Sequence, residues 1–396
     1  MKTCRTFFLS VLALSLLVAA PWPSAAARIV GITPDSEYLL FVVDTSASMR
    51  RYEWDRVAAM IPEVIAMYPT VRGIQVINDQ GNHLIESFRN EWIPNTPVNL
   101  GWVLDELGDW ADFSESNPRR GLLAAIDRYY DPDKSIAVIL LSDDFSAGAA
   151  AIDSVVAEIA ARNPVPEDGV TPMRIHGVAF PVFLDQIGRD QFLGSTGADV
   201  ATLMTMLSRD HGGGFVALPP RKSVAAAAAD TNRVLIVVDD STTMEPYWQR
   251  AVDSVEWLLG ETGAGDEFQV MTLTTAAQSL VPGTEGRWLS DAGGALRQSL
   301  VAGLRQATPV GAVDLGGVPA VIRGLDPLPD AVYVIAASDN SLERGSFPAV
   351  RMDNPGGPPL TILLFGAGDN PRAVPYYWAL AFDGGGSLVA PAEDWP

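Results

Sequence analysis

The sequence contains one short pattern of oxygen-bearing side chains twice. In the first copy, Asp44, Ser46 and Ser48 are separated by single residues, and Met49 follows them directly. A carboxylate and two hydroxyls at this spacing can present three oxygens on one side of a turn. Oxygen ligands of this kind match hard cations such as Mg²⁺, Mn²⁺ or Ca²⁺. The second copy consists of Asp239, Ser241, Thr243 and Met244.

A further acid follows a later apolar segment in each half of the chain. Asp143 comes at the end of the apolar run 136–141, and Asp339 comes after the run 332–336. The turn at Asp44 also follows an apolar run, as expected of a parallel strand buried on both faces. Ligands bind parallel sheets at the carboxyl ends of the strands. We therefore predict that Asp143 lies close to the Asp44 turn and that Asp339 has the same relation to the second turn.

The two patterns belong to a longer internal duplication. Residues 38–49 return 195 positions later as residues 233–244, and three further blocks recur in the same order. A repeat of this length predicts two whole domains rather than a solenoid. The further blocks are 136–144 with 332–340, Arg120-Gly121 with Gly316-Gly317, and 211–218 with 383–390. The expected organisation is a signal peptide at 1–27, a first domain at 28–218, a linker at 219–232 and a second domain at 233–396.

Strands alternate with helices in each half, which predicts the α/β class. The expected architecture is a pair of Rossmann-like, doubly wound, mostly parallel sheets in tandem. Val57, Ile61 and Val64 recur at helical spacing after the first turn, with Pro62 at a kink or a late helix start. The expected strands are 39–43, 74–77, 83–88 as a possible edge strand, 136–141, 175–180, 234–238, 269–273, 332–336 and 361–365, and a last short strand follows each glycine-rich turn at 212–214 and 384–386.

This arrangement resembles the von Willebrand factor type A domain and its metal-ion-dependent adhesion site. The resemblance rests on the strand, the Asp-x-Ser-x-Ser turn with its Met, the helix, and the later strand ending in Ser-Asp, and it covers most of both halves. It implies a Mg²⁺-type ion, with Mn²⁺ or Ca²⁺ as alternatives. It also implies a protein ligand whose Asp or Glu carboxylate completes the coordination of the ion.

One position departs from the pattern of that family in both halves. The family carries a Thr in the loop before a later helix, where this chain has Asn117 in the first half and Val313 in the second. Ser114 or Ser116 could supply the hydroxyl in the first half, so we expect the ion there rather than in the second half. The alternative is that these side chains only cap the following helices. The metal-ligand candidates are Asp44, Ser46, Ser48, Ser116 and Asp143, followed by Asp239, Ser241, Thr243 and Asp339.

The N-terminal residues have the layout of a secretory signal. Lys2 and Arg5 precede the apolar run 7–20, and small residues follow at 24–27. An uncleaved anchor is the alternative, although the run is shorter than the roughly 20 residues of a membrane-spanning helix. We expect a periplasmic or extracellular protein without membrane insertion once the signal is removed. The formal charge of −21 disfavours binding to nucleic acid and to anionic membranes.

These observations favour an exported, non-enzymatic binding or adhesion protein that holds a protein partner through a divalent cation. A structural or assembly scaffold with degenerate metal sites is the first alternative. A metal-assisted hydrolase is the second, but the sequence offers no recognisable general base. The only histidines, His83, His176 and His211, lack the spacing of a zinc site.

Overall fold

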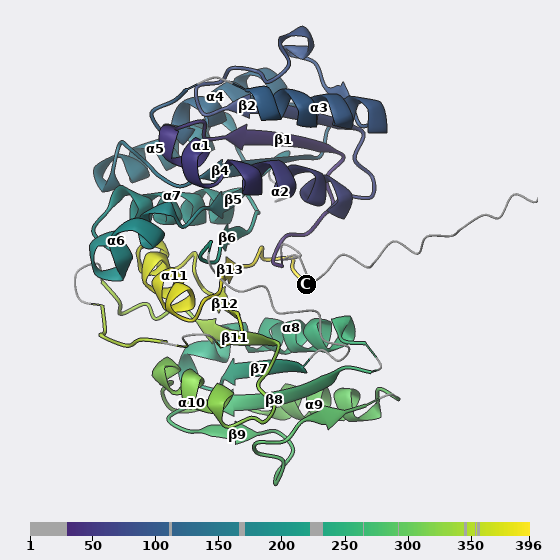
Figure 1. The fold of residues 1–396 in the computed structure, drawn as a ribbon, viewed down its shortest axis with the longest axis vertical. Helices are drawn as coiled ribbons and strands as arrows, with labels where there is room; N and C mark the ends of the chain where they lie inside the picture. Colours follow the sequence, from purple (N-terminus) through teal and green to yellow (C-terminus); the bar gives the residue numbers. More distant parts are fainter. Residues whose placement is uncertain are drawn as a thin grey trace, which may run out of the picture.

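One twisted sheet of thirteen strands runs through the described part of the chain in the computed structural model (Figure 1). The structure describes residues 30–110, 113–165, 171–221, 233–263, 265–291, 293–343, 347–352, 354 and 357–396. The predicted signal peptide and residues 222–232 of the predicted linker lie outside these ranges. Within them, no helix is both long and apolar enough to cross a membrane.

The first half alternates strands and helices as the sequence predicts. Pro62 lies inside a helix that buries Val57, Ile61 and Val64, so the helical spacing is confirmed. The strands are β1 (Tyr38–Val43), β2 (Gly73–Asn78), β3 (Ile93–Pro94), β4 (Ile136–Ser142), β5 (Met173–Ala179) and β6 (Phe215–Ala217). The helices are α1 (Ala47–Tyr52), α2 (Trp54–Met67), α3 (Pro97–Asp109), α4 (Pro118–Tyr129), α5 (Ile152–Arg162), α6 (Val182–Phe192) and α7 (Thr196–Asp210), with 3-10 turns η1 (Glu86–Phe88) and η2 (Ala149–Ala151).

The second half repeats this plan, although α10 has 6 residues where α4 of the first half has 12. Its strands are β7 (Arg233–Asp239), β8 (Glu267–Leu273), β9 (Ala277–Ser279), β10 (Leu289–Ser290), β11 (Ala331–Ala337), β12 (Leu360–Phe365) and β13 (Leu388–Ala390). Its helices are α8 (Trp248–Glu261), α9 (Ala295–Gln306), α10 (Val318–Arg323) and α11 (Val374–Asp383), with 3-10 turns η3 (Thr242–Tyr247), η4 (Leu315–Gly317) and η5 (Pro371–Ala373).

The strand order confirms the predicted doubly wound, mostly parallel architecture. The first half runs β3-β2-β1-β4-β5-β6, and the second runs β10-β8-β7-β11-β12-β13 with β9 paired to β8. In each half the Asp turn follows the strand at which the order reverses, which is where parallel sheets bind ligands.

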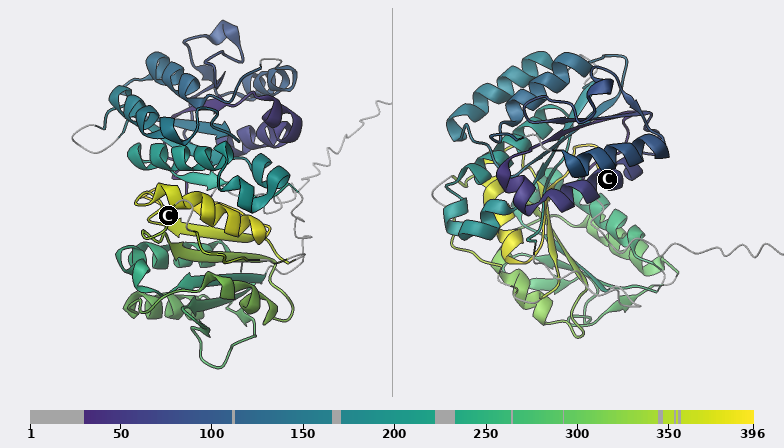
Figure 2. Two further views of the ribbon diagram at one scale, coloured as in Figure 1. Left: turned by 90° about the vertical axis from the view of Figure 1, so that its left-hand side faces the viewer. Right: turned by 45° about the horizontal axis from the view of Figure 1, so that its top comes forward.

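The two halves join through an antiparallel pair of strands. β6 pairs with β13, with Val216 opposite Val389, so both halves share one sheet in place of the two separate sheets that the sequence predicts. The yellow C-terminal segment accordingly lies between the teal and green parts of the chain in Figure 1 and in the left view of Figure 2. Gly213 and Gly386 precede these two strands, and a Cβ at either would overlap a backbone carbonyl of the neighbouring strand. Glycine is therefore required where each joining strand enters the sheet.

The sheet is buried on both faces, and each face has one core that continues across the joint. Leu40 and Val42 of β1 point into one core, whereas Leu39, Phe41 and Val43 point into the other. The first core also contains Trp378 of α11, and the second contains Trp248 of α8. This alternation explains why β1 reads as an uninterrupted apolar run in the sequence.

The expected strand at 83–88 is wrong. His83 makes only an isolated bridge to Ile77, and residues 86–88 form η1. The amide of buried Gln75 donates to the carbonyls of Phe88 (3.1 Å) and Glu91 (2.8 Å), which turns the chain before the edge strand β3. The second half uses the same device, with Gln269 donating to the carbonyls of Thr284 and Arg287.

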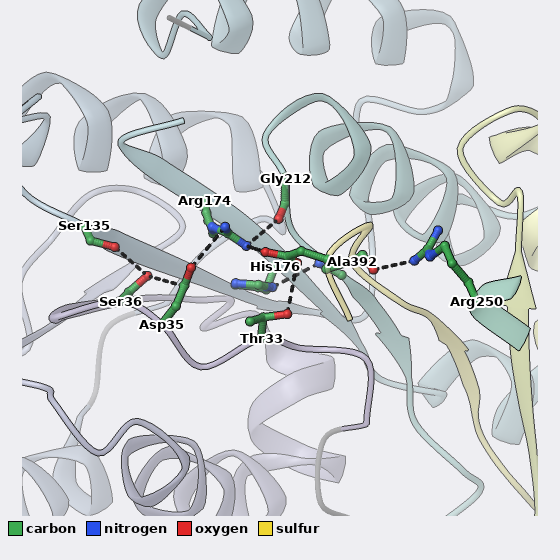
Figure 3. Close-up of polar contacts among 11 residues, drawn as sticks. Thr33, Asp35, Ser36, Ser135, Arg174, His176, Gly212, Arg250 and Ala392 are labelled. Carbon is green, nitrogen blue, oxygen red and sulfur yellow. Dashed lines mark hydrogen bonds and ion pairs between the residues drawn. The ribbon is translucent and has the colours of Figure 1, made fainter. Parts of the chain in front are cut away.

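A buried histidine lies where the C-terminal segment crosses the first half (Figure 3). The Nδ1 atom of His176 accepts a hydrogen bond from the Gly214 amide at 3.0 Å, and burial lowers the pKa of His176 to about 3. Beside it, Arg174 forms ion pairs with Asp35 and Asp394. The folded protein therefore holds a neutral imidazole at this crossing.

We predict that His176→Asn flattens the acid branch of the stability curve. The folded-state pKa lies below the unfolded value of about 6.5, so this group contributes full stability above pH 6.5 and loses it as the pH falls. The loss amounts to about 1.4 kcal/mol per pH unit while the group titrates. Urea unfolding between pH 8 and pH 4 measures it, with each protein referenced to its own value at pH 8. A variant curve parallel to the unmutated one would contradict the prediction.

We also predict that Trp378→Ala destabilises both halves together. Trp378 is fully buried, contacts Phe192 of the first half edge to face at 5.2 Å and donates to the Leu218 carbonyl. Its removal should cost about 3–5 kcal/mol. Trp102→Ala is the matched control, because Trp102 is 39% exposed. Denaturant unfolding monitored separately in each half should show the same decrease in midpoint for both halves. A decreased midpoint in only one half would contradict the prediction.

Candidate functional site

The first Asp turn is held by hydrogen bonds to the main chain and to neighbouring hydroxyls. Asp44 is fully buried at the end of β1, and its Oδ1 accepts from the Ser46 amide at 2.8 Å. Its Oδ2 accepts from the Ser142 hydroxyl at 2.6 Å, and the Ser46 and Ser48 hydroxyls lie 3.0 Å apart. Ser46 also caps α1 through a 3.5 Å bond from the Met49 amide, so helix capping and ligand presentation coexist here.

Asp143 is the acid of this site whose charge is not balanced. It lies at the end of β4, is 1% exposed, and neither carboxylate oxygen has a hydrogen-bond partner among the described residues. Burial, followed by the charge of Asp44, raises the pKa of Asp143 well above its ordinary value, while the Ser48 hydroxyl acts in the opposite direction. The predicted proximity of Asp143 to the Asp44 turn is therefore present in the structure.

The loop before α4 supplies one hydroxyl to the site, from Ser114. Ser114 forms a bridge with Ser46, and its hydroxyl donates to Asp44 Oδ1 at 3.4 Å. Ser116 instead has a left-handed φ of 52°, and its carbonyl accepts from the amide and hydroxyl of Ser146. Ser116 thus shapes the loop, whereas Ser114 occupies the position next to Asp44.

Asp79 is a buried acid of this site that the sequence analysis missed. Its carboxylate accepts from the Thr45 amide at 3.3 Å and from the Asn117 amide at 2.8 Å, so it ties the Asp turn to the loop before α4. Burial and the negative charge of Asp79 together raise the pKa of Asp44 to about 6. The position of Asp79 directly after β2 was the available signal, because β2 neighbours β1. Ser142 was missed too, although it immediately precedes Asp143.

The donor set suits a hard cation better than a soft one. Among the described residues there is no cluster of three or more His, Cys, Asp or Glu side chains that could hold a metal. An ion at the first turn would therefore rest on Asp44 and Asp143 together with the hydroxyls of Ser46, Ser48 and Ser114. Two acids with neutral hydroxyls match Mg²⁺, Mn²⁺ or Ca²⁺, and the unpartnered oxygens of Asp143 give such an ion a place to bind.

The second Asp turn is arranged differently. Asp239 is buried at the end of β7 and accepts from the Ser241 amide at 2.8 Å, and burial raises its pKa. Thr243 is exposed. Asp339 is also exposed, and its Oδ1 accepts from the amide and the hydroxyl of Ser341 at 2.8 Å and 2.7 Å. Two of the four predicted ligands in this half are therefore exposed rather than buried with Asp239.

Comparison with known proteins shows similarity of fold to several solved structures. No family model and no curated protein matches the chain. Among solved structures, proximal thread matrix protein 1 from the mussel byssus is 12% identical over 90% of this chain and 92% of its own, with a TM-score of 0.31. A second structure of that protein, with a TM-score of 0.30 and the same identity and coverage, has a zinc-occupied MIDAS motif.

Two further solved structures match less of the chain. The von Willebrand factor type A protein from Catenulispora acidiphila is 16% identical over 43% of this chain and 49% of its own, with a TM-score of 0.29. The SpRpn10 VWA domain is 11% identical over 41% of this chain and 90% of its own, with a TM-score of 0.26. At these identities the likeness concerns the fold alone.

We predict that Asp143→Asn stabilises the metal-free protein. Burial and the charge of Asp44 raise the pKa of Asp143, so the folded protein disfavours the ionised carboxylate that the unfolded chain carries at pH 7.5. An amide does not ionise, and removing such a poorly compensated buried group is worth roughly 1–3 kcal/mol. Urea unfolding in EDTA at pH 7.5 should show a gain of about that size. Glu63→Gln changes the net charge equally at an exposed position of α2 and should have little effect. If Asp143→Asn were instead less stable in EDTA, the prediction would be wrong, because the metal-free protein would already stabilise the Asp143 carboxylate.

Proposed function

We propose that this chain is an exported, non-enzymatic binding protein that captures a protein partner through a divalent cation held in its first half. The observation that carries the proposal is Asp143, which is 1% exposed and has two carboxylate oxygens without partners among the described residues. A buried pair of acids is costly unless a cation compensates it. Asp44 and Asp143, with the Ser46 and Ser48 hydroxyls, would hold such an ion.

The neutral hydroxyls explain how an ion at this site would bind a partner. Two carboxylates and several neutral oxygens balance a divalent charge without occupying all six or more ligand positions. An Asp or Glu side chain of a partner would fill a remaining position. The sequence resembles von Willebrand factor type A domains, and that resemblance agrees with this mode of binding.

The surface next to the site supports a protein rather than a free carboxylate as the ligand. Phe113 is 68% exposed and immediately precedes Ser114, which bonds to Asp44. Nearby, Arg50 donates to the Trp110 carbonyl and so links α1 to the start of the same loop. Aromatic side chains, including Phe, are enriched at protein–protein interfaces relative to the rest of the surface.

The chemistry of the histidines supports a role in binding rather than in hydrolysis. A hydrolase would place a proton acceptor next to the ion and its bound water. His83 pairs with the Tyr129 hydroxyl, His176 with the Gly214 amide and His211 with Asn163, and each is buried. Burial lowers the pKa of all three. None of the three histidines is therefore hydrogen-bonded to a residue of the Asp turn.

Calorimetric titration tests the proposal. We expect Mg²⁺ and Mn²⁺ to bind the mature chain with submillimolar affinity, and Asp143→Asn to abolish binding while Glu63→Gln leaves it unchanged. Two acids with hydroxyl oxygens place the affinity in the range of protein Mg²⁺ and Ca²⁺ sites, roughly 10⁻³ M or tighter. If neither ion binds the unmutated protein, the scaffold alternative replaces the proposal.

Partner capture forms the second arm of the same test. The immobilised chain should retain a protein in Mg²⁺ and release it in EDTA, whereas the Asp143→Asn chain should retain none. Phe113→Ser should weaken capture without changing the Mg²⁺ titration, because Phe113 would contact the partner rather than the ion. Capture that persists in EDTA and in the Asn variant would place the binding surface elsewhere.

A further inference from the structure

The two halves differ in the register between the strand of the Asp turn and the strand of the second acid. In the first half, Val43 pairs with Leu141, so Asp44 is level with Ser142, one residue before Asp143. In the second half, Val238 pairs with Ile335, so Asp239 is level with Ala336. Asp239 corresponds to Asp44 and Asp339 corresponds to Asp143 in the duplication. β11 has therefore shifted by two residues relative to β7.

This shift moves the second acid away from its turn. A parallel strand rises by roughly 3.3 Å per residue, so two residues carry Asp339 roughly 6–7 Å further along the strand than Asp143. A shift of two keeps each side chain on its original face, so the core packing of β11 survives. The apolar pattern of the sequence therefore does not reveal it.

The hydrogen bonds agree with the register. In the first half the Ser142 hydroxyl bonds to Asp44 at 2.6 Å, but the hydroxyl of the corresponding Ser338 has no partner among the described residues. Asp143 is buried without partners, whereas Asp339 is exposed and bonded to Ser341. The amide of Asp339 also donates to the Tyr377 hydroxyl at 2.9 Å, which holds this segment in its shifted place.

The remaining oxygens of the second turn do not replace the missing acid. Among the described residues the oxygens without hydrogen-bond partners here are Oδ2 of Asp239, Oδ1 of Asp240 and the neutral hydroxyls of Ser241 and Ser338. The adjacent Asp240 lies just after β7, which ends at Asp239, and β8 and β11 flank β7 on opposite sides. Its equivalent Thr45 lies towards β2, next to the Asn78 amide, and the Asp240 main chain bonds to Leu273 at the end of β8.

We infer that the chain takes up one divalent ion, in the first half, and that the second half presents no ion to a partner. The inference rests on the proposed function, because it concerns the same kind of ion. Each chain then has one ion to which a partner carboxylate can bind. One partner carboxylate is therefore bound per chain. The second half serves to complete the shared sheet and to flank the site.

Counting bound Mn²⁺ on the full mature chain tests this inference. Electron paramagnetic resonance of free Mn²⁺ and calorimetry should both give one ion per chain. Asp339→Asn and Thr243→Ala should leave that number and the affinity unchanged; both positions are exposed, so these variants should fold. Asp239→Asn should also keep one ion, and Asp143→Asn should keep none.

The number of bound ions distinguishes failure of this inference from failure of the proposed function. Two ions per chain, with one lost in Asp339→Asn or Asp239→Asn, would overturn the inference and leave the first-half site intact. A single ion lost in Asp239→Asn but retained in Asp143→Asn would move the site to the second half and overturn both. If no ion binds, the proposed function fails first and the inference fails with it.

Discussion

The antiparallel pairing of β6 with β13 is the contact on which the arrangement of the whole molecule depends. It reverses the strand direction between the halves, which alone would point the two Asp turns in opposite directions. Sheet twist offsets this reversal. Seven strand steps separate β1 from β7, and at roughly 20–25° each they rotate the strand direction by about 140–175°. The reversal and the twist together bring β1 and β7 back to nearly the same direction, as the arrows of β1 and β8 show (Figure 1).

The carboxyl ends of the strands in both halves consequently face one side of the molecule. Where the halves meet, Arg372 of η5 forms an ion pair with Asp153 of α5 at 3.2 Å, which links the segments that follow β12 and β4. Asn370, next to η5, donates to the Asp339 carbonyl at 3.1 Å. Arg189, only 8% exposed, adds an ion pair with the partly buried Asp383. These contacts fix one Asp turn relative to the other.

The strands, the duplication and the first Asp turn could be predicted from the sequence, because each is visible as a pattern of residue types along the chain. β1 and β7 are long apolar runs, and the glycine-rich turns mark the last strand of each half. The joint could not be predicted, because β6 and β13 have three residues each and nothing in them specifies a partner strand. Asp79 and Gln75 were missed for a related reason. Both bond to main-chain groups of segments distant in the sequence, and a polar residue within or just after a strand does not indicate which segment it will contact.

The register shift shows why a motif can persist while its chemistry changes. The Asp turn of the second half keeps its residues because Asp239 still binds the Ser241 amide and Met244 is still buried in the core. These local roles preserve the pattern whether or not an ion binds. The second acid has no such role at the turn, because only strand register brings it there. A slip of two residues leaves each side chain of β11 on its original face of the sheet and still separates the acids. Strand register therefore distinguishes the two halves in addition to the differences in residue identity at the two turns.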